Sequence, residues 1–166
     1  MDDALSIAEI MFRDRSSLVT LVAGVLVLAP LAQLLACRAG WSRPRRAAAA
    51  LAGVGLAGTV ALTLGRWFVL SDWEWRGCSA GSSLTALDGE AILNWLVLAP
   101  VGFFAMLAWQ RLLPVLVACA AVPLLVEALQ SFAALGQCQA ADVVRNGGGA
   151  LAAALLGAGV LALGRR

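Results

Sequence analysis

The sequence predicts an all-α membrane protein, a polytopic bundle of about five transmembrane helices that forms one domain over residues 1–166. Three observations support this fold class. The chain is 61% hydrophobic and only 13% charged, whereas an average soluble domain has about 25% charged residues. Its apolar residues gather into five runs of about 20 residues, the length at which a helix crosses ~30 Å of hydrocarbon. Arginines are concentrated in one short loop between two of these runs.

The stretch before the first apolar run, residues 2–15, has polar and apolar residues on opposite faces of a helix. This pattern predicts a helix that lies in the membrane interface, and the alternative is a solvated tail. Asp2 and Asp3 stand where a signal peptide has a basic region, and no small-residue cleavage site follows. We therefore expect the first apolar run to remain in the mature protein.

The five predicted spans cover about 17–36, 47–65, 92–109, 112–131 and 141–163. Two of them carry small residues at close spacing, namely Gly53, Gly55 and Gly58 in the second and Gly149, Ala153 and Gly157 in the fifth. Small residues let helix backbones approach closely in membranes. The alternative is that they are lipid-facing positions in a chain rich in small residues.

The loop between the first two spans contains Arg38, Arg43, Arg45 and Arg46. Cytoplasmic loops carry an excess of Lys and Arg, so this loop should be cytoplasmic, with the N-terminus outside and the C-terminus in the cytoplasm. All twelve basic residues are Arg, and Ala, Leu, Gly and Val dominate, which suggests a GC-rich bacterial genome and hence a bacterial cell membrane. A net charge of +2 without a dense basic patch argues against nucleic-acid binding.

Cys78 and Cys138 fall in the two large loops that this topology places outside, where disulfides persist. We predict that they form a disulfide, and the alternative is two free loop thiols. Cys37 and Cys119 lie at a helix end and within a span, where packing is the expected role. Three tryptophans in the first large loop, Trp67, Trp73 and Trp75, are typical of an interfacial belt, or alternatively of a platform for a ligand.

Polar residues interrupt the apolar pattern where the fourth span ends and the fifth begins. Glu127 and Gln130 are three residues apart, and Asp142 and Asn146 are four apart, so each pair shares a helix face. A short connection makes the two spans antiparallel neighbours, so the four groups should converge, with Asn94 joining from the third span. We take these five residues as a candidate binding cluster.

Ionisable groups within membrane spans are functional candidates by default. One interpretation of the cluster is a proton-active pair of Glu127 and Asp142, and another is a site for a polar headgroup or peptide. A structural interpretation has Gln130 and Asn146 bridging helices while Glu127 accepts loop amides. Because the chain has no His, we assign no catalytic residues and expect no metal site or cofactor.

Residues 90–150 resemble the VanZ-like family of small bacterial membrane proteins. That family has a helix ending in Glu-x-x-Gln, a short loop, and Asp-x-x-x-Asn-x-x-Gly at the start of the last helix. Glu127, Gln130, Asp142, Asn146 and Gly149 match this pattern, and an upstream Asn followed by Pro-x-Gly-Phe is matched by Asn94, Pro100, Gly102 and Phe103. The resemblance implies a cell-envelope protein, in a family named for a factor that lowers sensitivity to the glycopeptide teicoplanin.

The chain departs from the family pattern in the loop before Asp142. Family members typically carry an Arg there, whereas this loop has Gly136, Gln137 and Gln139. An Arg–carboxylate pair would therefore need Arg145 or Arg76 to be brought close by the fold.

The resemblance and the residues together favour a non-enzymatic binding or accessory protein. Its polar pocket in the outer leaflet would take a membrane lipid, a lipid-linked envelope precursor or a lipoglycopeptide. The alternative is a membrane-embedded enzyme that acts on a lipid-linked substrate with Glu127 and Asp142 as an acid–base pair. A transporter or flippase ranks last, because the cytoplasmic halves of the predicted spans carry few polar residues.

Overall fold

The computed structural model describes residues 15–64, 77–81, 83–85, 88–132 and 138–164. The described helices are α2 (Arg15–Arg38), α3 (Arg43–Leu64), α4 (Gly89–Val97), α5 (Ala99–Trp109), α6 (Leu112–Phe132) and α7 (Ala140–Leu163), and two short strands are β1 (Cys78–Ser79) and β2 (Cys138–Gln139). Five spans are long and apolar enough to cross a membrane, with α4 and α5 together forming the third. The predicted all-α multi-pass fold is confirmed. Residues 2–14 of the predicted interfacial helix and Trp67, Trp73 and Trp75 lie outside the described residues.

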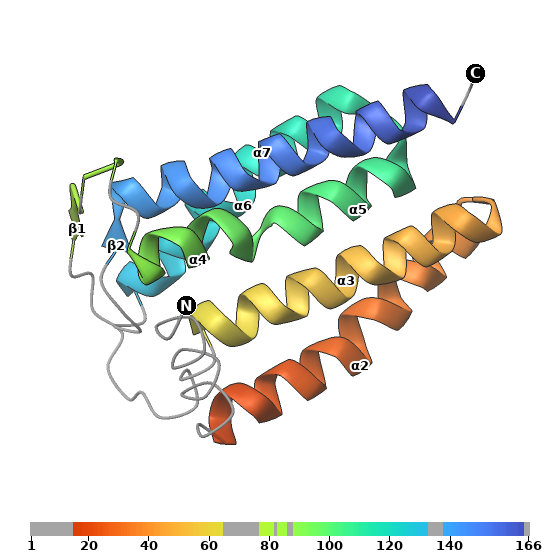
Figure 1. Ribbon diagram of the computed structural model, residues 1–166. Coiled ribbons are helices and arrows are strands. Elements are labelled where there is room, and N and C mark those ends of the chain that lie inside the picture. The colour runs from red at the N-terminus through yellow and green to blue at the C-terminus, as the bar shows by residue number, and fades with distance from the viewer. Residues whose placement is uncertain (1–14, 65–76, 82, 86–87, 133–137, 165–166) are drawn as a thin grey trace.

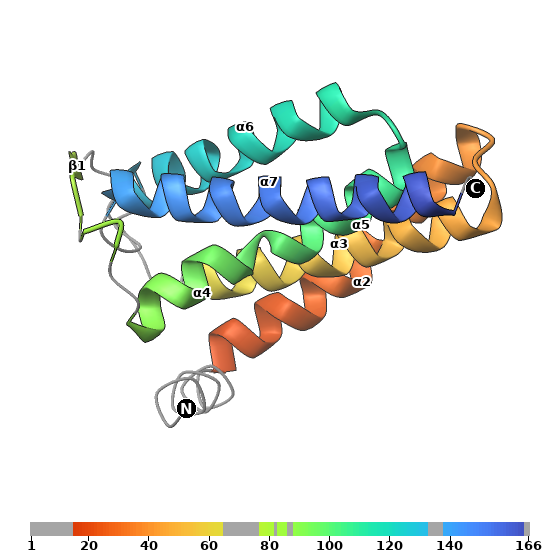
Figure 2. The ribbon, with the colours of Figure 1, turned by 45° about the horizontal axis from the view of Figure 1, so that its top comes forward.

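The spans lie alongside one another and define two ends of the bundle (Figure 1). The end that holds β1 and β2, where α4 and α7 begin and α3 and α6 finish, is called the disulfide end below. The opposite end, where α3 and α6 begin, is called the arginine end. Helix α7 packs against α4, α5 and α6, and α3 packs between α2 and α5. Figure 2 shows α7 running between α6 and α5, so α7 has a neighbouring helix on each of two sides.

The third span is broken at Leu98, between α4 and α5. Pro100 occupies the first turn of α5, and a helix cannot continue unchanged through a proline because its nitrogen has no hydrogen to donate. The hydroxyl of Thr59, which is buried on α3, lies 2.9 Å from the carbonyl oxygen of Val97 and donates to it. This bond satisfies a backbone acceptor next to the break, and it ties α3 to the third span.

Glycines bring α7 into backbone contact with the third span. A Cβ atom at Gly149 would overlap the carbonyl oxygen of Trp95, and one at Gly102 would overlap that of Ala150. No side chain larger than hydrogen fits at either position, which is the geometry by which small residues pack membrane helices. The prediction of close backbone approach is confirmed at Gly53, Gly55, Gly149 and Gly157, whereas Gly58 has no described neighbour within 4 Å of such a Cβ.

Candidate functional site

The disulfide predicted between Cys78 and Cys138 is present and closes the disulfide end. The two residues also face each other in a parallel pairing of β1 with β2, and the amide of Ala141 donates to the carbonyl of Ala80 (3.1 Å). Residues 77–81 and 83–85, called the strap below, therefore lie along the end of α6 and the start of α7. Cys37 and Cys119 are free thiols, exposed and buried respectively.

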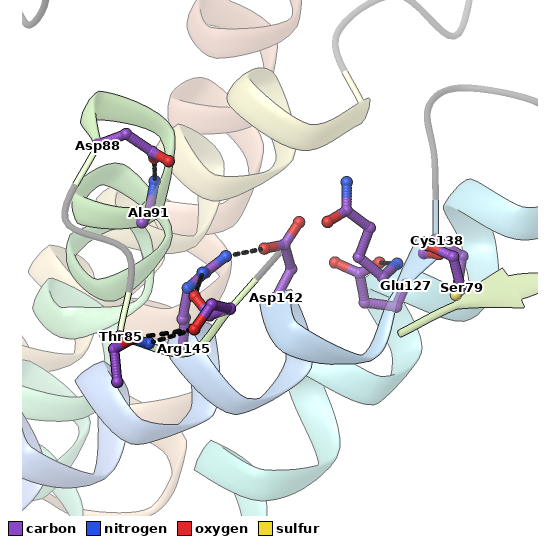
Figure 3. A network of polar contacts seen from close by, with 10 residues as sticks. Ser79, Thr85, Asp88, Ala91, Glu127, Cys138, Asp142 and Arg145 are labelled. Carbon is purple, nitrogen blue, oxygen red and sulfur yellow. Dashed lines mark hydrogen bonds and ion pairs between the residues drawn. The ribbon is translucent and has the colours of Figure 1, made fainter. Parts of the chain in front are cut away.

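Arg145 provides the cation of the site. It lies three residues after Asp142 on α7, so the two side chains share a helix face, and its Nη1 is 3.1 Å from Asp142 Oδ1. Its Nη2 donates to the carbonyl of Ser83 on the strap (2.6 Å). Only 1% of Arg145 is exposed, and Figure 3 shows its guanidinium between the strap and Asp142. An Arg–carboxylate pair is thus present although the preceding loop lacks an arginine, and Arg76 lies outside the described residues.

Glu127 joins the end of α6 to the start of α7. Its side chain is buried, and its Oε2 accepts a hydrogen bond from the amide of Gln139, the residue that precedes α7 (3.0 Å). The first amides of a helix have no partner within the helix, and a carboxylate is a strong acceptor for them. In Figure 3 Asp142 lies between Arg145 and Glu127.

The neighbouring polar residues of α6 bind other elements. Gln130 Nε2 donates to the carbonyl of Thr63 in the last turn of α3 (3.2 Å), and the buried Ser131 hydroxyl donates to the carbonyl of Gly77 on the strap (3.2 Å). Gln130 therefore bridges α6 to α3, as the structural interpretation of the sequence expected. Within the described residues no hydrogen bond joins its carboxamide to Glu127 or Asp142.

The two asparagines of the candidate cluster, Asn146 on α7 and Asn94 on α4, differ in burial. Asn146 is 2% exposed and lies one turn after Asp142 on the same face of α7. Its Oδ1 accepts no hydrogen bond from any described residue. Asn94 is half-buried on α4, next to Trp95, whose carbonyl meets Gly149. No described hydrogen bond or ion pair joins Asn94 to the other four residues, so its part in a site stays a prediction.

Three contact partners of the cluster are not among the five candidate residues predicted from the sequence. Arg145 is one of them, and its spacing of three from Asp142 is a signal that the sequence carries. Ser83 and Thr63 contribute only their backbone carbonyls, and a carbonyl leaves no mark in the sequence. These contacts depend on where the strap and the end of α3 lie in the fold.

The arrangement holds two carboxylates and one guanidinium where the membrane spans meet. Taking such charges out of water is costly, and hydrogen bonds and ion pairing offset that cost only in part. Oδ2 of Asp142, Oε1 of Glu127 and Oδ1 of Asn146 accept no hydrogen bond from described residues. These acceptors remain unpaired within the described part of the chain, and Arg145 fixes the orientation of Asp142.

A family model described as VanZ/LLP1 matches residues 61–161. The match includes both cysteines of the disulfide and every residue of the candidate cluster. No curated protein and no solved structure matches the chain.

Proposed function

Because the chain belongs to the VanZ/LLP1 family, we propose that it is a non-enzymatic accessory protein of the bacterial cell envelope that binds the polar part of a lipid-linked or lipidated ligand. The single observation that carries the proposal is the buried group of Glu127, Asp142, Arg145 and Asn146 at the disulfide end. Charged groups at such a position are costly and are expected to serve a ligand. The family resemblance suggests that the role concerns glycopeptides of the teicoplanin type or envelope lipids.

The contacts of the carboxylates favour binding over acid–base catalysis. Asp142 is paired with Arg145, and Glu127 accepts a backbone amide, so the fold holds one oxygen of each carboxylate in place. A residue that shuttles protons would have to give up these contacts in each cycle. As fixed acceptors, the same groups are already oriented for a ligand that donates hydrogen bonds, which reduces the ordering cost of binding.

We place the disulfide end of the bundle outside the cytoplasm. Disulfides persist in oxidising compartments, and arginine-rich loops stay in the cytoplasm. In this protein the disulfide and the arginine-rich loop lie at opposite ends of the helix bundle. The polar cluster would then face the outer leaflet, where a lipid-linked envelope precursor or a lipoglycopeptide is encountered.

Cysteine labelling in intact cells tests this orientation. We expect a membrane-impermeant maleimide to label Glu90→Cys in a Cys37→Ser background, because Glu90 is exposed at the disulfide end. Native Cys37, exposed at the arginine end, should be labelled only after the cells are permeabilised. Labelling of Cys37 in intact cells, with Glu90→Cys protected, would reverse the proposed orientation.

Ligand binding is tested by purifying the protein in nanodiscs of its host membrane and identifying the retained molecules by mass spectrometry. We expect one class of envelope lipid or lipid-linked precursor to be retained, and we expect Glu127→Gln and Asp142→Asn to reduce its occupancy at least tenfold while the disulfide stays formed. If folded variants retain the same molecules as the wild type, the cluster is a structural clamp. Chemical conversion of a supplied lipid-linked precursor would instead support the alternative that the protein is a membrane-embedded enzyme.

A further inference from the structure

The arginine end has basic residues without acidic partners. Among the described residues, five arginines lie at this end, namely Arg38, Arg43, Arg45, Arg46 and Arg111. No Asp or Glu occurs in residues 16–71, 91–126 or 143–166, which include every described segment at this end. The described part of the chain therefore supplies no carboxylate at this end to balance the positive charge.

Two of the five arginines are used to hold the fold together. Arg45 Nε donates to the carbonyl of Ala108 at the end of α5 (2.7 Å), and its guanidinium stacks 4.5 Å from the centre of the Trp41 ring. Arg46 Nε donates to the carbonyl of Trp41 (2.6 Å). The bond from Arg45 to Ala108 brings the turn between α2 and α3 next to the turn between α5 and α6. Arg43 and Arg111 consequently belong to one surface.

The other three arginines, Arg38, Arg43 and Arg111, are exposed. Their side chains form no hydrogen bond or ion pair with the described part of the chain. Trp109, which is 43% exposed, is the last residue of α5 and lies two positions before Arg111. Tryptophan beside arginine at the end of a transmembrane helix is typical of the headgroup level of a bilayer.

Helix ends add to the positive potential of this surface. Helices α3 and α6 begin here, and neither has an acidic residue in its first turn. At the disulfide end the chain supplies its own carboxylates to helix starts: Asp88 accepts from the amide of Ala91 at the start of α4, and Asp142 lies in the first turn of α7. The partial positive charge at the starts of α4 and α7 is thus offset by carboxylates of the chain, whereas no acidic residue lies in the first turn of α3 or α6.

We propose that the arginine end binds the phosphate of anionic phospholipid headgroups through Arg38, Arg43 and Arg111. Guanidinium groups bind phosphate with paired hydrogen bonds, and basic residues beside transmembrane helices attract anionic lipids. This lipid site lies at the opposite end of the bundle from the polar cluster, so it goes beyond the proposed function and does not depend on it.

The test uses the full-length protein in nanodiscs of phosphatidylcholine and phosphatidylglycerol mixed at a 7:3 ratio. After release into detergent, native mass spectrometry gives the ratio of the two lipids retained on the protein. We expect phosphatidylglycerol to be enriched on the wild type and its enrichment to fall about fivefold for each arginine changed to Gln. The variant Arg38→Gln/Arg43→Gln/Arg111→Gln should lose at least tenfold and retain the lipids near their mixing ratio.

Arg15→Gln is the matched control, because Arg15 is exposed at the start of α2, at the disulfide end. It removes the same charge and should leave the retained ratio unchanged. Equal enrichment in the wild type and the triple variant, or an equal loss in Arg15→Gln and Arg111→Gln, would overturn the proposal. If the triple variant does not elute as a folded protein with its disulfide formed, the test rests on the two single variants. Lower enrichment of phosphatidylglycerol on Arg111→Gln than on Arg15→Gln then supports the proposal, and equal enrichment overturns it.

Discussion

Replacing Arg145 with methionine is expected to lower the free energy of unfolding by about 3–5 kcal/mol, the cost of removing one partner of a buried ion pair. The change leaves the buried Asp142 without its cation and the Ser83 carbonyl without the donor at 2.6 Å. Methionine keeps much of the side-chain volume, so the loss reflects charge and hydrogen bonding more than packing. Denaturation in detergent, followed by the loss of helical signal, measures the effect.

A double-mutant cycle separates the charge effect from the loss of the strap contact. We expect Asp142→Asn/Arg145→Met to be clearly more stable than Arg145→Met alone, because the double variant no longer buries an unpaired carboxylate. We also expect Arg145→Lys to recover only part of the stability, since an ammonium lacks the fork that reaches Asp142 and Ser83 together. Equal stability of Arg145→Met and the wild type would show that the ion pair between Asp142 and Arg145 contributes nothing to the free energy of unfolding.

Removing the disulfide with Cys78→Ser/Cys138→Ser should destabilise the protein by about 4 kcal/mol, the chain-entropy value for a closed loop of about 60 residues. The two cysteines are 60 positions apart in sequence, so the bond strongly restricts the unfolded chain. The same denaturation experiment gives the value, and adding a reductant to the wild type should reproduce it.

Cys37→Ser is the matched control for the loss of a cysteine, because Cys37 is exposed and free. It should change the free energy of unfolding by less than about 0.5 kcal/mol, as expected for a surface substitution. A disulfide variant as stable as Cys37→Ser would mean that the remaining contacts of the strap, to Arg145, Ser131 and Ala141, hold it without the covalent bond.

Much of the fold could be predicted from hydropathy alone. The five predicted spans correspond to the five observed, but several helices extend beyond the apolar runs to include Arg15, Arg38 and Arg43. Arginine at a helix end can place its charge in the headgroup region, so a helix continues where the apolar pattern stops. The break in the third span follows from Pro100, a signal that was visible in the sequence. Which helices are neighbours was not visible, because it depends on backbone contacts such as Gly149 with Trp95.

The candidate site could be predicted in part. Helical spacing placed Glu127 and Asp142 at one end of the bundle, and their proximity follows from two antiparallel spans joined by a short loop. Spacing could not predict that Gln130 would reach the Thr63 carbonyl on α3, because the sequence does not reveal the position of α3. The disulfide was predictable because topology left two cysteines on one side, and its pairing brings the strap to Arg145.

The most direct test of ligand binding at the disulfide end compares two charge-neutralising variants in native nanodiscs. Glu127→Gln removes a buried carboxylate of the cluster, and Glu90→Gln removes an exposed one at the same end. With both variants folded and their disulfides formed, we expect at least tenfold lower occupancy of the co-purified envelope ligand in Glu127→Gln and unchanged occupancy in Glu90→Gln. Equal occupancy in the two variants would show that the buried cluster does not bind the ligand.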